Sequence, residues 1–120
     1  MQLSELLATV PAPIEVAAAD VAAARSDDLV FVVLDDDPTG TQSVAGLPVL
    51  TRWEAEDLDW ALARPAPAVY VLTNTRSLGE DDAAARNREV VAVAVAAAAR
   101  AGKRVSFVSR SDSTLRGHFP

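Results

Sequence analysis

Three clusters of polar residues carry the side chains that could do chemistry. Each follows a short apolar run: Asp35–Gly40 (DDDPTG), Thr73–Ser77 (TNTRS) and Ser109–His118 (SRSDSTLRGH). The first supplies adjacent carboxylates, which can act as a general base, accept hydrogen bonds from a polyol or bind Mg²⁺. The others supply arginines, whose planar guanidinium groups grip carboxylate or phosphate. These residue types indicate a site for a hydroxylated or anionic small molecule.

Each cluster also has a purely structural interpretation. Asp-Pro-Thr-Gly is good turn chemistry, and Asp37 could cap that turn. This explains one aspartate but not three adjacent ones, which repel each other. Arg76 could form a surface ion pair with Glu80 or Asp81. His118 is the single histidine, and the chain has no cysteine, so a transition-metal site is disfavoured and we expect no bound metal.

Composition and missing motifs exclude several classes of protein. The net charge of −6 disfavours nucleic-acid binding. The longest apolar run, Val90–Ala99, is about half of what a membrane span needs, and the amino terminus lacks the basic residues of a secretory signal. We therefore expect a cytoplasmic protein. The five glycines are too scattered for GxGxxG, GxxxxGK[ST] or GxSxG, so no common nucleotide-phosphate loop is present.

The elements that must position these clusters follow from hydrophobic pattern. Apolar, β-branched runs predict four strands, at Leu29–Leu34, Leu47–Leu50, Ala68–Thr73 and Arg104–Val108. The first run is continuous, which is typical of a strand buried on both faces. Pro48 favours an edge position or a strand start for the second.

Two helices are expected between the strands, with a helical lead-in before them. One helix begins with a capping box of Thr51 and Glu54 and ends near Arg64, before two prolines. The other follows a capping box of Ser77 and Glu80 and runs from about Glu80 to Ala101, where Gly102 stops it. Residues 1–28 are predicted to form two short helical pieces, broken by prolines.

Alternating strands and helices predict an α/β fold: an open parallel sheet of about four strands with flanking helices, Rossmann-like. We assign residues 29–120 to this domain. It is expected to be incomplete, because a fourth parallel strand normally leads to another crossover helix. The polar clusters would converge at the carboxyl ends of the strands, where ligands bind in such sheets. An unfinished sheet edge favours association, so a homo-oligomer is left open.

Three strings of residues resemble one family. VVLDDDPTGTQSVAGLPVLTRW, VYVLTNTRSL and VSRSDSTLRGHFP are similar to the amino-terminal domain of four-carbon acid sugar kinases, from about Leu29 to Pro120. The resemblance implies an ATP-dependent enzyme of carbohydrate metabolism that phosphorylates acids such as threonate, erythronate or their 3-oxo derivatives. It further implies that this domain holds the sugar acid, while a separate carboxy-terminal domain binds ATP and Mg²⁺.

The resemblance also implies roles for individual residues. Asp36 and Asp37 would contact substrate hydroxyls, one of them as the catalytic base, and Arg76 and Arg110 would bind the carboxylate. The remaining members of the implied substrate site are Thr39, Gly40, Asp112, Ser113, Arg116, Gly117 and His118.

The chain departs from the family pattern in two places. Ala45 stands where many relatives carry a histidine. The chain also stops at Pro120, before any nucleotide-binding domain. We therefore expect a portion of a kinase that binds no cofactor and is inactive alone, with a sugar acid and the missing domain as its partners.

Two other functions remain as alternatives. Asp35, Asp37 and Thr39 satisfy the DxDx[TV] signature of phosphatases that resemble haloacid dehalogenases, with Asp35 as nucleophile and Asp37 as acid/base. Thr73 or Thr75 would supply the second-strand hydroxyl. That family usually continues with apolar residues, and its later acidic pair is missing here. The second alternative is a non-catalytic fragment that only binds a sugar acid.

Overall fold

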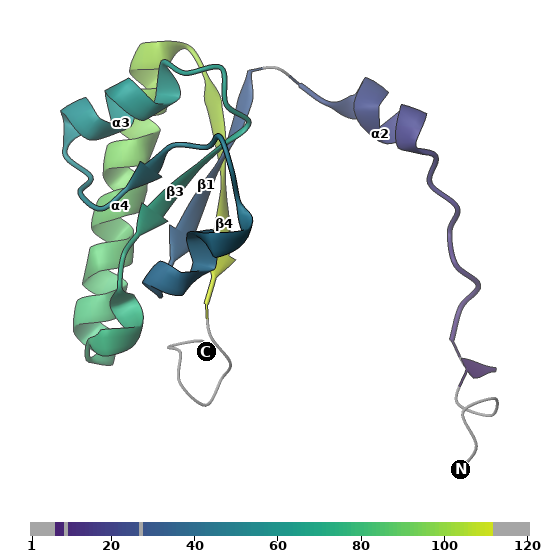
Figure 1. Cartoon of the computed structure of the whole chain (residues 1–120), viewed down its shortest axis with the longest axis horizontal. Coiled ribbons are helices and arrows are strands. Elements are labelled where there is room, and N and C mark those ends of the chain that lie inside the picture. Colours follow the sequence, from purple (N-terminus) through teal and green to yellow (C-terminus); the bar gives the residue numbers. More distant parts are fainter. Residues whose placement is uncertain (1–6, 9, 27, 112–120) are drawn as a thin grey trace.

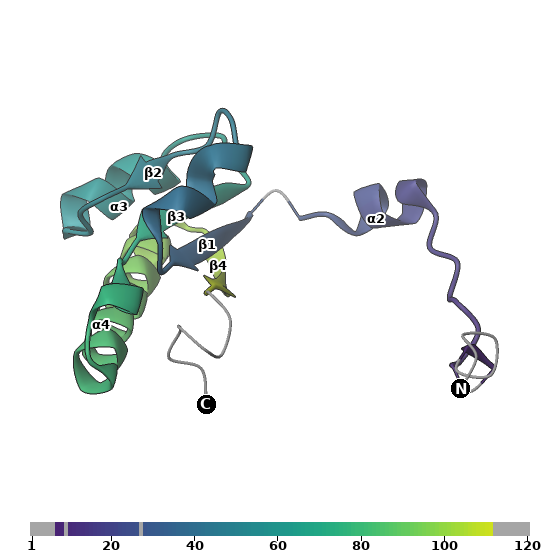
Figure 2. The same ribbon diagram turned by 60° about the horizontal axis from the view of Figure 1, so that its bottom comes forward.

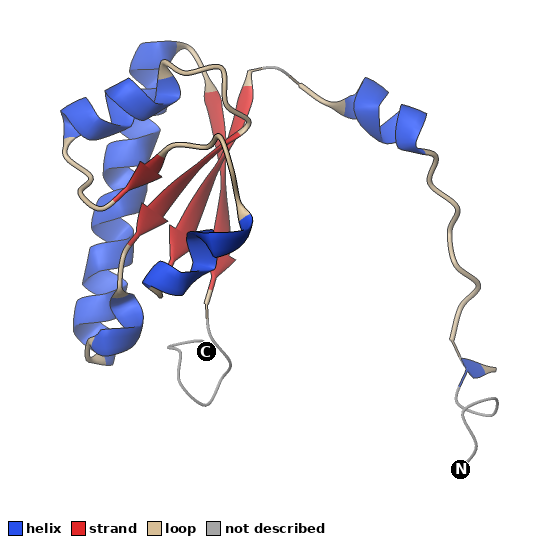
Figure 3. Cartoon of the chain, viewed as in Figure 1, coloured by secondary structure: helices blue, strands red, loops and turns tan. Residues whose placement is uncertain are grey.

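The computed structural model describes residues 7–8, 10–26 and 28–111. Within them, four parallel strands form one sheet in the order β2-β3-β1-β4 (Figures 1 and 3). The strands are β1 (Leu29–Asp35), β2 (Val49–Leu50), β3 (Ala68–Leu72) and β4 (Arg104–Arg110). The helices are α2 (Ala18–Ala24), α3 (Ala55–Leu62) and α4 (Glu80–Ala101), with short 3₁₀ turns η1 (Pro38–Ser43) and η2 (Thr75–Ser77). The predicted parallel α/β fold is confirmed.

Helices α3 and α4 pack together on one face of the sheet and enclose the core (Figures 1 and 2). Alternate residues of β1 and β3 point into this layer, because successive side chains of a strand face opposite sides. The buried core consists of Val30, Val32, Leu50, Leu58, Ala61, Leu62, Val69, Val71, Val90, Ala94, Ala97 and Ala98. The small alanines of α4 let the helix approach the sheet closely.

The opposite face of the sheet is only partly covered. Turn η1 lies over it near the carboxyl ends of the strands (Figure 2). Further back along β1, Phe31 stays 42 % exposed, whereas Val33 is buried. The prediction that β1 is buried on both faces is therefore wrong at Phe31. The reason is that both crossover helices of the described chain lie on the other side.

The helices begin and end close to the predicted residues, but their N-cap residues differ from the predicted ones. Helix α4 spans the predicted residues and ends at Gly102, whose φ of 63° is the left-handed conformation of a glycine stop. Its N-cap is Gly79, with no side-chain cap. The predicted Ser77 cap is wrong, because the Ser77 hydroxyl donates to the Asn74 carbonyl (2.9 Å).

The cap of α3 lies three residues later than predicted. Glu54 is the N-cap, and its capping box is completed by Asp57 rather than by Thr51. Asp57 also accepts two hydrogen bonds from the Arg52 guanidinium, at 2.8 and 2.9 Å. These contacts hold residues 51–54 outside the helix, so α3 begins at Ala55. The second strand is likewise shorter than predicted: it begins at Val49, directly after Pro48, and lies at the edge of the sheet as expected.

The lead-in contains one described helix, α2, and none of its residues is buried. It lies apart from the sheet, at the end of an extended segment (Figure 1). The other predicted helical piece, around Ser4, lies outside the described residues. In the described part of the chain, no helix combines the length and apolar character needed to cross a bilayer.

We expect Val90→Ala to lower the free energy of unfolding by about 2 kcal/mol, because it removes two buried methyl groups and leaves a cavity. Val90 is 0 % exposed, whereas Val95 of the same helix is 50 % exposed. Val95→Ala is therefore a matched control that should change stability by less than about 0.5 kcal/mol. Denaturant unfolding of both variants measures the difference, and equal losses would contradict this packing.

Candidate functional site

The carboxyl ends of β1, β3 and β4 meet at one end of the sheet. Asp35, the last residue of β1, lies opposite Leu72 of β3 and Arg110 of β4. From this point β1 leads into η1 on one face of the sheet, whereas β3 leads through η2 into α4 on the other (Figure 2). Neighbouring strands whose connections leave toward opposite faces create a crevice, and open α/β proteins bind ligands there.

Asp35 is the deepest of the three adjacent aspartates and is 0 % exposed. Its Oδ1 accepts hydrogen bonds from the Asp37 N–H (3.3 Å) and from Arg110 Nη1 (3.3 Å). Its Oδ2 is buried and has no hydrogen-bond partner among the residues that the structure describes. Burial raises the pKa of the Asp35 carboxyl, the Arg110 charge opposes this shift, and the nearby Asp36 charge adds to it.

Gly40 closes over the buried carboxylate of Asp35. A Cβ atom at position 40 would overlap the Asp35 Oδ2, so only glycine fits here without displacing the carboxylate. This contact fixes η1 against the end of β1. Gly40 was predicted as a substrate contact. In the structure its backbone packs against the carboxylate of Asp35.

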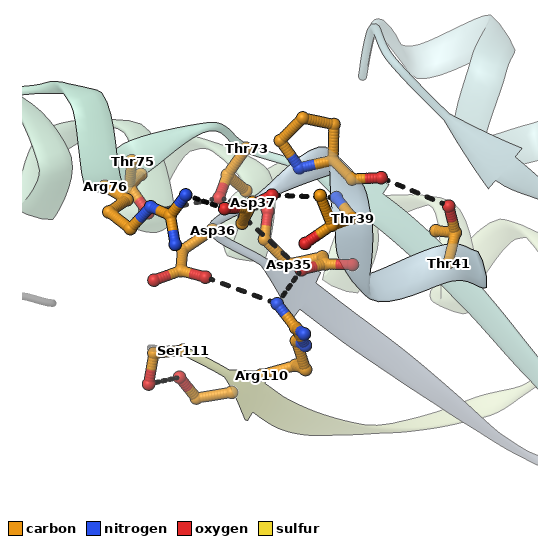
Figure 4. Close-up of polar contacts among 12 residues, drawn as sticks. Asp35, Asp36, Asp37, Thr39, Thr41, Thr73, Thr75, Arg76, Arg110 and Ser111 are labelled. Carbon is orange, nitrogen blue, oxygen red and sulfur yellow. Dashed lines mark hydrogen bonds and ion pairs between the residues drawn. The ribbon is translucent and has the colours of Figure 1, made fainter. Parts of the chain in front are cut away.

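Asp36 joins the ends of β4 and β3 through its backbone. Its N–H donates to the Arg110 carbonyl (3.2 Å), and its carbonyl accepts from the Arg76 N–H (3.4 Å). The Asp36 carboxylate is 5 % exposed, and its Oδ1 lies 3.9 Å from Arg110 Nη1. The Arg110 guanidinium therefore lies between two carboxylates (Figure 4).

Asp37 has two engaged carboxylate oxygens. One accepts from the Thr39 N–H (2.8 Å), which caps the start of η1, and the other forms an ion pair with Arg76. The structural interpretation of Asp37 as a turn cap is thus correct, but it did not include the ion pair with Arg76. Arg76 pairs with this aspartate rather than with Glu80 or Asp81 as the structural alternative proposed.

The exit of β3 is held by a second set of contacts. Thr73 donates from its N–H (2.8 Å) and its hydroxyl (3.0 Å) to the Asp35 carbonyl, and its hydroxyl lies 3.2 Å from that of Thr75. Asn74 follows in the left-handed conformation, with φ of 51°, which asparagine adopts more readily than most residues other than glycine. This turn directs Arg76 back toward Asp37 (Figure 4).

Arg86, which was not among the predicted site residues, supports this turn from α4. Its Nη1 donates to the Thr73 carbonyl (3.0 Å), and its guanidinium lies 5.8 Å from the centre of the Trp53 ring. A signal was present in the sequence. Position 86 falls three residues after Ala83 and four before Val90, on the buried stripe of the helix, where an arginine needs a partner.

The chain was compared with known proteins. A family model described as the sugar-binding N-terminal domain matches residues 31–120, three quarters of the chain. The chain belongs to this family. The family is that of the amino-terminal domains of four-carbon acid sugar kinases, and the match confirms the resemblance seen in the sequence. No curated protein and no solved structure matches the chain.

For this sugar-binding domain, the structure brings together the predicted residues Asp36, Asp37, Arg76 and Arg110. Thr39 adjoins them through its backbone. The other predicted members of the site lie outside the described residues, namely Asp112, Ser113, Arg116, Gly117 and His118. The described site therefore contains three carboxylates and two guanidinium groups, one excess negative charge when all are ionised.

The described carboxylates do not form a cation site. Within residues 7–8, 10–26 and 28–111, no group of three or more acidic or histidine side chains is arranged to hold a metal ion. Asp35 and Asp37 direct oxygens at arginines instead. The arrangement suits a ligand that carries both hydroxyl groups, which carboxylates accept, and a negative group, which guanidinium groups bind.

We expect Gly40→Ala to destabilise the fold by about 1–3 kcal/mol, the usual penalty for forcing extra atoms into a packed site. The cause would be overlap with the Asp35 carboxylate. In an Asp35→Ala background the overlap is gone, so the same substitution should have little effect. A double-mutant cycle by denaturant unfolding measures this coupling, and additive effects would show that the two residues do not constrain each other.

Proposed function

We propose that this chain is the substrate-binding portion of an ATP-dependent kinase for four-carbon sugar acids, of the threonate, erythronate or 3-oxo-tetronate type. The observation that supports it best is the pairing of two arginines with buried aspartates across three strand ends. Arg76 and Arg110 keep 36 % and 43 % of their side chains exposed. Their guanidinium groups therefore reach the surface of the crevice while their positions are set from below.

A sugar acid matches this arrangement at both ends. Its carboxylate would meet the exposed faces of Arg76 and Arg110, and bidentate charge-assisted hydrogen bonds are the strongest of their kind. Its hydroxyl groups would donate to carboxylate oxygens, and the family's description as a sugar-binding domain supports a ligand with hydroxyl groups. A neutral polyol could satisfy only the second set of contacts.

The two predicted catalytic aspartates are not equivalent. A general base needs a lone pair aimed at the hydroxyl that it deprotonates. Both oxygens of Asp37 are engaged, by the Thr39 N–H and by Arg76. These contacts give Asp37 the task of holding η1 and Arg76 in place. The proposal keeps Asp36 and Asp37 as the two candidates for the base.

Phosphoryl transfer also requires ATP and Mg²⁺, which the described residues do not fit. The described carboxylates form no metal cluster, and the sequence has no glycine-rich phosphate loop. Bound Mg-ATP would supply the phosphoryl group. Our proposal places the groups that hold it outside the described residues, in a separate nucleotide-binding domain.

No observation favours the phosphatase alternative. Its nucleophile would be Asp35, whose side chain is fully buried beneath Gly40. A nucleophile must reach the phosphorus atom of the substrate. The family match also belongs to a different class of protein.

Calorimetric titration with threonate and erythronate tests the proposal. We expect one of the acids to bind, and Arg76→Gln or Arg110→Gln to weaken it by about 10- to 100-fold, the effect of losing a charge-assisted hydrogen bond. Arg100→Gln is the matched control, because Arg100 pairs with Asp59 on an exposed surface of the helix layer.

The neutral tetrol threitol should bind at least tenfold more weakly than its acid, by the same reasoning. Equal binding of threitol and threonate would show that the arginines do not recognise a carboxylate. Failure of a folded chain to bind any of these ligands would overturn the proposed function.

A further inference from the structure

Asp35 is the one aspartate of the cluster that neither the family resemblance nor the proposed function uses. It is 0 % exposed, yet its carboxylate contacts the arginine that we assign to the substrate carboxylate. We propose that Asp35 is a positioning residue: it holds Arg110 in the empty site and takes up a proton when a sugar acid engages that arginine. This inference rests on the proposed function.

The surroundings of Asp35 leave its charge dependent on Arg110. From β4 it faces Arg110 (3.3 Å), and from the end of β1 it faces the carboxylate of Asp36. Turn η1 presents the backbone of Gly40 and the Asp37 N–H. Strand β3 presents the Thr73 hydroxyl, which bonds to the Asp35 carbonyl and not to its carboxylate. Among the described groups that face it, Arg110 is thus the cation.

Arg110 already serves two carboxylates, because its Nη1 also lies 3.9 Å from Asp36 Oδ1. A third carboxylate, brought by the ligand, would share or take over the same guanidinium. In either case the negative charge around Asp35 increases, while the positive charge of Arg110 compensates the Asp35 carboxylate less. A buried carboxylate in that position becomes neutral rather than remain uncompensated.

The proton balance follows directly. The free acid ligand is ionised near neutral pH and stays ionised when bound to arginine. One proton passes from the solvent to the Asp35 carboxylate and forms an O–H bond, and no other bond changes. Binding should therefore weaken as the pH rises, by at most about tenfold per pH unit when one proton is taken up.

The buried Oδ2 of Asp35 is consistent with this exchange. It has no hydrogen-bond partner in the described structure, although a permanently ionised carboxylate at this depth would be expected to use both oxygens. Burial already raises the pKa of this group in the free chain. The negative charge of a bound ligand would shift this pKa in the same direction.

Calorimetry in two buffers with different ionisation enthalpies, at the same pH, counts the protons taken up. We expect uptake of up to one proton per bound threonate or erythronate in a pH series over which both acids are ionised, and none with threitol. Asp35→Asn keeps the shape of the side chain and should abolish both the uptake and the pH dependence of the affinity. Asp59→Asn removes an exposed carboxylate elsewhere and should leave the uptake unchanged.

A second measurement does not depend on the Asp35 variant being folded. Infrared difference spectra of the unmodified chain should gain the band of a protonated carboxyl group when the acid is added. Binding of the acid without proton uptake, or uptake that persists in Asp35→Asn, would overturn the role of Asp35 while leaving the proposed function intact. No binding of either acid would overturn both.

Discussion

The structure depends on how three adjacent carboxylates are compensated at the end of a buried strand. The strand β1 delivers Asp35, Asp36 and Asp37 into a region where each is at most 5 % exposed. Isolated charges there would cost several kcal/mol each. The compensation comes from Arg110 and Arg76, at the ends of the two strands that flank β1. Strand order and site chemistry are therefore linked, because β1 lies between β3 and β4 and so receives a guanidinium group from each side.

The backbone around the aspartates makes the compensation rigid. The Asp36 carbonyl accepts from the N–H of Arg76 in η2, which follows β3, and the Asp36 N–H donates to Arg110 at the end of β4. A shift of either neighbouring strand would therefore strain a hydrogen bond of the site. Turn η1 is fixed at both ends of the cluster, by the cap from Asp37 and by the contact of Gly40 with Asp35. Such over-determined geometry is what a preorganised binding site needs, because the ligand then does not have to order it.

Much of the fold could be predicted from the sequence, because the spacing of apolar residues and the glycine that ends a helix are local signals. The four strands, the bounds of α4 and the convergence of polar strand ends all follow from such patterns. The capping residues of α3 and α4 could not be predicted from the local sequence. Ser77 has more than one acceptor within reach, and Asp57 more than one donor. The pairing of each arginine with its aspartate, and the support from Arg86, depend on strand order and helix placement.

Prior pairing of the arginines also bears on selectivity. A guanidinium that already contacts a buried carboxylate attracts a free anion less strongly than an isolated one, since part of its field is neutralised. A simple anion such as inorganic phosphate would have to compete with the aspartates and would gain little beyond charge. A sugar acid brings hydroxyl groups that can donate to the same carboxylates while its own carboxylate takes the arginine. The site therefore discriminates by the combination of hydroxyl and carboxylate rather than by charge alone.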